Sequence, residues 1–127
     1  MAYFGASINE QPVLAEVAGA EIAAGSGKAV KYNSEGKVVL AGAGEAICGV
    51  LIMQTEEKVA AGDIVTVQFK DIGIVAAGGT FAKGDALSAD ANGAFVKATS
   101  GKAVARALEA GSAGTFVRAH ICVVPTV

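Results

Sequence analysis

The chain has 127 residues and a formal net charge of −2, with ten Lys and Arg against twelve Asp and Glu. This length fits one domain with its own core. The basic residues are few and scattered, which argues against nucleic-acid binding through a basic patch. Charged residues also interrupt every apolar stretch before it reaches the length of a membrane-spanning helix. We therefore expect neither nucleic acid nor a membrane as a partner.

Residues 1–24 are expected to form an N-terminal arm, because they fall outside the repeat described below. Large apolar side chains occur here without a sustained period: Tyr3, Phe4, Ile8, Val13 and Leu14. Segments of this kind often become ordered against a partner, and clustered apolar side chains tend to mark a binding surface. The alternative is an edge strand with a loop, packed on its own domain. Gly19 interrupts 16–24, the best helix candidate of the chain.

Residues 28–51 and 85–108 carry one pattern twice, at an offset of 57 residues and without a gap. The identical positions of the first copy are Ala29, Gly36, Ala41, Gly44, Ala46 and Leu51, and those of the second are Ala86, Gly93, Ala98, Gly101, Ala103 and Leu108. An internal repeat fixes the architecture. It predicts a single β domain over 25–127, with repeat one at about 25–77 and repeat two at about 78–127.

Each copy has the pattern of short strands separated by glycine turns. The turns at 33–36 and 90–93 both end in Gly, which adopts positive φ without steric cost. Asn92-Gly93 between apolar residues is a strong hairpin signal. Each copy ends in an alternating strand, Ile64–Lys70 or Thr115–Val124. The predicted fold class is all-β: a sandwich or barrel of short antiparallel strands built from two pseudo-repeats, with an extended N-terminal arm.

The last strand has two unlike faces. Its apolar face is expected to carry Val117, Ala119, Ile121 and Val123, and the opposite face Phe116, Arg118, His120 and Cys122. The second face is too polar for a core and too apolar for open solvent. We therefore predict an oligomer interface at Phe116, Arg118 and His120, close to a symmetry axis where the same patch is reused.

The sequence offers little catalytic chemistry. Gly25–Lys28 fails as a phosphate loop, because Ile22 and Ala29 stand where Gly and Ser or Thr are required. His120 and Cys122 form a His-x-Cys pair, but zinc sites usually show four ligands and closer Cys pairs. A single His leaves little room for acid–base catalysis. We expect no catalytic residue, no metal and no cofactor. Cys48 and Cys122 are expected to be free thiols in a reducing compartment, although their corresponding strands leave a pair open.

A prosthetic-group carrier is the alternative of a different class. Lipoyl and biotinyl domains are also small quasi-symmetric β folds with a modified Lys at a hairpin tip. Lys58 follows Glu56-Glu57, which resembles the acidic flank of a lipoyl lysine. The match is loose, because Val59 stands in place of Ala and the Met-Lys-Met signature is missing. The alternative function is thus a small cellular β domain that carries a prosthetic group or binds a ligand.

Segments over about 25–124 resemble one known family. They are the steps Gly27-Lys28 and Gly84-Asp85, the segments 41–50 and 61–67, and the bridge 78–87 between the copies. This pattern resembles the small Ala/Gly-rich capsid decoration (cement) proteins of tailed bacteriophages. The second copy departs from it, with Arg106 in the place of Gly49 and no Ala-Gly-Asp step.

The resemblance implies a structural virion protein without catalysis that binds the outside of an assembled capsid and stabilises it. It also implies a major capsid protein as partner, a homo-oligomer, commonly a trimer, and a place on the outer capsid surface after synthesis in the host cytoplasm. The arm residues named above, Tyr3, Phe4, Ile8, Val13 and Leu14, are the expected capsid contacts.

Overall fold

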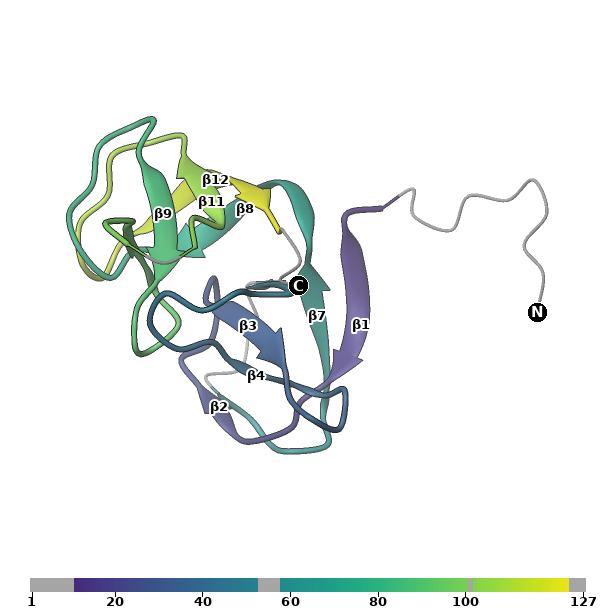
Figure 1. Ribbon diagram of the computed structural model, residues 1–127. Coiled ribbons are helices and arrows are strands. Elements are labelled where there is room, and N and C mark those ends of the chain that lie inside the picture. The colour runs from purple at the N-terminus through teal and green to yellow at the C-terminus, as the bar shows by residue number, and fades with distance from the viewer. Residues whose placement is uncertain (1–10, 53–57, 101, 124–127) are drawn as a thin grey trace.

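The computed structural model describes residues 11–52, 58–100 and 102–123. Every helix or strand in these ranges is a β-strand, so the predicted all-β class is confirmed. Two five-stranded antiparallel sheets and a small two-stranded sheet make up this part of the chain, in a sandwich-like arrangement. Figure 1 shows the two larger sheets as neighbouring bodies, with the chain passing once from one to the other. Among the described residues, no helix has the length and apolar content needed to cross a membrane.

The first half of the protein, residues 11–69, holds the first larger sheet and the small one. The larger sheet has the order β1-β7-β5-β3-β4, and β2 pairs with β6. The strands are β1 (Val13–Val17), β2 (Ile22–Ala23), β3 (Ala29–Tyr32), β4 (Val38–Leu40), β5 (Gly49–Leu51), β6 (Lys58–Val59) and β7 (Ile64–Gln68).

The second half, residues 70–123, repeats this topology. Its sheet has the order β10-β9-β11-β12-β8. The strands are β8 (Lys70–Ala76), β9 (Ala86–Ala89), β10 (Phe95–Lys97), β11 (Ala105–Ala107) and β12 (Phe116–Cys122). Therefore β8 corresponds to β1, β9 to β3, β10 to β4, β11 to β5 and β12 to β7.

The glycine turns of the two halves are built alike. The Asn33 side-chain oxygen accepts from the backbone N–H groups of residues 35 and 37, at 2.9 and 3.0 Å. The Asp90 carboxylate does the same for residues 92 and 94, at 2.8 and 3.0 Å. Gly36 and Gly93 close these turns with φ of 76° and 81°. A short polar side chain that bonds the backbone ahead of it favours such a turn, as the sequence predicted.

The structure corrects the gapless alignment of the repeats. The Ala41 N–H donates to the Ala29 carbonyl, and the Ala98 N–H donates to the Ala86 carbonyl in the same way. At these positions the two copies are 57 residues apart, as the sequence alignment has them. In the next strands, Cys48 N–H bonds to Val30 while Val104 N–H bonds to Leu87, so the offset falls to 56. The loop before β11 is therefore one residue shorter than the loop before β5. Despite this difference, β11 pairs with β9 in the same register as β5 pairs with β3.

As a consequence, the identities Ala46 with Ala103 and Leu51 with Leu108 are not structural equivalences. Arg106 corresponds to Val50, because Arg106 pairs with Ala86 and His120 as Val50 pairs with Ala29 and Gln68. The apparent replacement of Gly49 by Arg106 is thus a replacement of Val50.

The repeat also begins earlier than the sequence predicted. Val13–Val17 forms β1, which pairs with β7 over its whole length, and β2 follows within the expected arm. β1 bridges to β4 through Ala18 and Val38, as β8 bridges to β10 through Ala77 and Phe95. From Val13 onward, the expected arm is therefore part of the first half. Residues 1–10, with Tyr3, Phe4 and Ile8, lie outside the described residues.

Two apolar cores fill the described part of the protein. The first half has a core of eight residues: Ala18, Ile22, Val30, Val38, Leu51, Val59, Val65 and Val67. The larger core belongs mainly to the second half, around the fully buried Phe95 and Leu87. Its remaining members are Val75, Ala77, Phe81, Ala89, Val104, Ala105, Ala107, Val117, Ala119 and Ile121, together with Ala29, Ala41, Ile47 and Val50 of the first half. The first half thus helps to close the core of the second.

Candidate functional site

The junction between the halves explains which surfaces remain open. β7 ends at Gln68 and β8 begins at Lys70, so one residue separates the two sheets. The buried Gln68 amide donates to the carbonyls of Lys70 and Ile72, both at 2.9 Å. A Cβ on Gly73 would lie 2.6 Å from the Gln68 side-chain oxygen, so a larger residue there would displace the Gln68 side chain. The junction is therefore a tightly packed contact.

Backbone hydrogen bonds cross the same junction. Ala29 N–H donates to Gly93 at 2.8 Å, and Ala76 N–H donates to Gly27 at 2.8 Å. Gly44 N–H donates to the carbonyl of Ala89 at 2.9 Å. These bonds hold one face of β3 and β5 over the end of the second core.

The face of β12 that the sequence singled out is on the surface, as its alternation predicted. Phe116 is 51% exposed, Arg118 and His120 are exposed, and the residues between them are buried. The neighbouring strand β8 places Ile74 opposite Arg118 and Ile72 opposite His120. Ile72 is 60% and Ile74 43% exposed. Exposed apolar side chains grouped in this way are typical of a binding surface.

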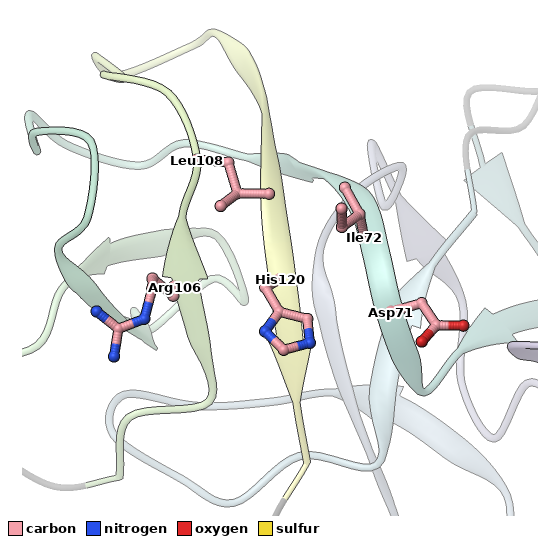
Figure 2. Close-up of a pocket in the computed structure, with 5 residues that line it drawn as sticks. All are labelled: Asp71, Ile72, Arg106, Leu108 and His120. Atoms are coloured by element: carbon pink, nitrogen blue, oxygen red, sulfur yellow. The ribbon is translucent and has the colours of Figure 1, made fainter.

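Next to this patch lies a shallow hollow lined by Asp71, Ile72, Arg106, Leu108 and His120. Figure 2 shows Arg106 and Leu108 on one side of His120 and Asp71 and Ile72 on the other, with the Arg106 guanidinium pointing away from His120. Arg106 and His120 are directly opposed across β11 and β12. The hollow combines the apolar Ile72 and Leu108 with the charged Asp71 and Arg106 and the His120 ring, a composition that suits a protein partner.

The charges around this surface are held by hydrogen bonds. The Arg118 backbone N–H and guanidinium donate to Glu109 at 2.9 and 3.1 Å. These contacts hold the pKa of the Glu109 carboxyl below its usual range, the backbone bond contributing most. Arg106 donates to the Gly84 carbonyl at 3.1 Å.

A second open surface lies at the end of the first core. Tyr32 is 48% and Leu14 40% exposed, and Cys48 is half-buried. The Tyr32 hydroxyl donates to the Glu16 carboxylate, which is the main reason that the Tyr32 pKa is raised. Burial raises the pKa of the Cys48 thiol to about 11, with a further contribution from the Glu16 charge.

The reactive groups of the described residues do not converge on one centre. Cys48 and Cys122 are both free. Cys122 Sγ lies 3.7 Å from His120 Nδ1, but no group of three His, Cys, Asp or Glu side chains in the described ranges is placed to hold a metal. Lys58 lies on β6 in an ion pair with Glu21 at 3.2 Å.

Sequence reasoning found the β12 face but missed its neighbours. Ile72, Ile74, Arg106 and Leu108 join it only because β8 and β11 flank β12 in the sheet. The β-branched residues Ile72, Ile74 and Val75 were a signal for β8. Of the expected capsid contacts, Val13 and Leu14 lie on β1, half-buried and exposed, whereas Tyr3, Phe4 and Ile8 lie outside the described residues.

The comparisons with known proteins give one informative result. No family model matches the sequence, and no curated protein matches it. Among solved structures, the chain is similar to the N base of the head fiber gp8.5 of bacteriophage phi29, with a TM-score of 0.66 and 18% sequence identity. The match covers 90% of this chain and 98% of the other. The protein therefore shares the fold of a phage head fiber base.

Proposed function

We propose that this protein is a structural component of a bacteriophage virion that binds the outer surface of the assembled capsid and stabilises it, without catalysis. The observation that carries the proposal is the fold, which is similar to that of a phage head fiber base over 90% of the chain. The decoration-protein pattern over about 25–124 supports the same role independently.

The described surface is compatible with this role. It offers an apolar patch at Ile72, Ile74 and Phe116 together with scattered polar groups. Many copies bind a capsid at once, so modest contacts for each copy are enough for a stable coat. We propose that the major capsid protein is the partner and that the segment preceding β1, with Tyr3, Phe4 and Ile8, makes part of the contact. Aromatic residues are frequent interface anchors.

Co-sedimentation tests the proposal directly. Capsids assembled from the major capsid protein that is the proposed partner are incubated with the purified protein, pelleted, and heated to the point of disruption. We expect saturable binding and a higher disruption temperature of the coated capsids. Absence of binding at micromolar concentration would overturn the proposal.

Two variants locate the contact. Deletion of residues 2–10 should leave the thermal stability of the free protein unchanged and abolish capsid binding. Phe116→Ser alters the apolar patch and leaves the N-terminal segment intact, so its capsid binding is compared with that of the deletion variant. Full binding by the truncated protein would show that the N-terminal segment is not the docking element. Intact mass after expression in a host with lipoyl and biotin ligases checks the carrier alternative, for which Lys58 would be modified.

A further inference from the structure

The two halves share one topology, but only one of them has its outer face covered. In the first half, the outer face of β3 and β5 and the segment between β4 and β5 pack into the second core through residues that are at most 6% exposed: Ala29, Ala41, Ile47 and Val50. The equivalent positions of the second half are exposed or half-buried: Ala86, Ala98, Ala103 and Arg106. We call this second set the free face. It has the same place on its sheet as a surface that the fold buries.

The surface that receives this covering face differs between the halves in the opposite sense: it is buried in the second half and open in the first. In the second half, the core end that accepts the first half contains Val75, Ala89 and Val104, each at most 3% exposed. Their equivalents in the first half are Glu16, Tyr32 and Cys48, which are exposed or half-buried. We call this set the open end. Each chain therefore carries one unfilled receiving end and one unused covering face.

The sequence differences at these two surfaces are complementary in charge. At the intramolecular junction, β5 and β8 contact one another, and Val50 and Val75 belong to the same core. The residue equivalent to Val50 on the free face is Arg106, and the residue equivalent to Val75 at the open end is Glu16, which pairs with Val65 as Val75 pairs with Val117. An apolar pair has thus been replaced at both positions at once, by residues of opposite charge. Ion pairs of this kind are used to fix partner and register.

The backbone groups needed for the same contact are also in place. Gly93 accepts from Ala29 at the junction, and its equivalent Gly36 is exposed, with open space around it. Ala18 N–H donates to Asp63, so by alternation along the ladder the Val17 N–H points to the open edge of β1. Val17 is the equivalent of Ala76, whose N–H donates to Gly27.

We infer that a second copy of this chain covers the open end with its free face, in a head-to-tail contact that repeats the internal junction. Arg106 pairs with Glu16 of the neighbouring copy, and His120 takes the place of Gln68 against β1. The two surfaces differ, so the interface is heterologous and the assembly closes as a ring if the rotation permits. The inference concerns the free protein and does not depend on capsid binding.

Charge reversal tests the contact in solution. Light scattering at micromolar concentration and neutral pH should give the wild type a mass that is a multiple of the 12.5 kDa chain. Arg106→Glu and Glu16→Arg should each raise the dissociation constant about tenfold or more. The double variant, Glu16→Arg with Arg106→Glu, should recover the oligomer. Circular dichroism of the single variants should still show the wild-type β spectrum.

The matched control reverses another exposed ion pair. Lys58→Glu and Glu21→Lys alter the ion pair between Lys58 on β6 and Glu21, which precedes β2, and neither residue belongs to the free face or the open end. Both variants should keep the wild-type mass. A monomeric wild type, or single variants of Arg106 and Glu16 with unchanged mass, would overturn the inference. Dissociation by both single variants without recovery in the double variant would overturn the proposed pairing.

Discussion

The two halves have the same strand order, but their cores are of different size and completeness. The second core contains sixteen buried residues, four of which come from the first half, while the first core contains eight. Where the second half buries Val75 and Ala89, the first half presents Glu16 and Tyr32. A repeated unit of about sixty residues buries only part of its apolar surface by itself. The composition of each copy therefore depends on what covers it.

The largest expected difference lies in the cores. Phe95→Ala should destabilise the protein by about 3–5 kcal/mol, because a fully buried aromatic side chain leaves a cavity in the larger core. The equivalent change, Val38→Ala, removes less volume and should cost about 1.5 kcal/mol before any cavity contribution. Urea unfolding of both variants measures the difference. A greater loss in Val38→Ala would mean that the first core is the more important one.

The second comparison isolates the junction. Gly36 and Gly93 both have positive φ, so Ala at either position costs about 1–2 kcal/mol of backbone strain. A Cβ on Gly93 would also lie 3.0 Å from the Ala29 carbonyl oxygen, whereas a Cβ on Gly36 meets open space. Gly93→Ala should therefore be the more destabilising variant in thermal unfolding. Equal losses would contradict close packing at the junction.

Gln68 gives a third, smaller effect. Gln68→Leu removes the donor to the carbonyls of Lys70 and Ile72 and should cost about 1–3 kcal/mol. Thr66→Ala is the matched control, because Thr66 is exposed on the same face of β7 and its loss should change stability by about 0.5 kcal/mol or less. Denaturant titration compares the two variants. Similar losses in the free energy of unfolding would mean that the Gln68 hydrogen bonds do not stabilise the junction between the halves.

The smallest expected effect is on the rate at which the two cysteines react with maleimide. The thiolate is the form that reacts with maleimide. Because the pKa of the Cys48 thiol is raised to about 11, Cys48 should be labelled much more slowly than the exposed Cys122 at neutral pH. Its rate should rise as the pH approaches 11, and mass spectrometry of peptides follows both sites. Equal labelling at neutral pH would show that the open end is more accessible than its burial indicates.

Part of this architecture could be predicted from the sequence. The turns with Asn33 and Asp90 are local, since one side chain bonds the backbone beside it, and the alternation of β12 is a property of consecutive residues. The register change was not predictable, because the identical Leu51 and Leu108 favoured a gapless alignment. Strand pairing shows instead that Ala107 corresponds to Leu51. Ala107 pairs with Ala119 on β12, and Leu51 pairs with the equivalent Val67 on β7.

The candidate surfaces show the same limit. Phe116, Arg118 and His120 were found because they alternate along one strand. Ile72 and Arg106 join them through sheet order, which depends on pairings between distant segments. The backbone conformation at the start of β8 was also hidden, since Asp71 adopts a φ of 66° where the sequence has no Gly. Positive φ at a non-Gly residue is imposed by the surrounding structure and is not readable from residue type.

The positions of the first and last strands affect how the fold bears a mechanical load. β1 is an edge strand whose only ladder is with β7, beyond the single bridge from the adjacent Ala18 to Val38 of β4, whereas β12 lies inside its sheet between β11 and β8. Under tension applied through the two chain ends, we expect β1 to detach first, because its resistance comes from one ladder. Detachment would uncover Val65 and Val67 while the second core stays closed. The fold would then lengthen in steps under force, with the first half yielding before the second.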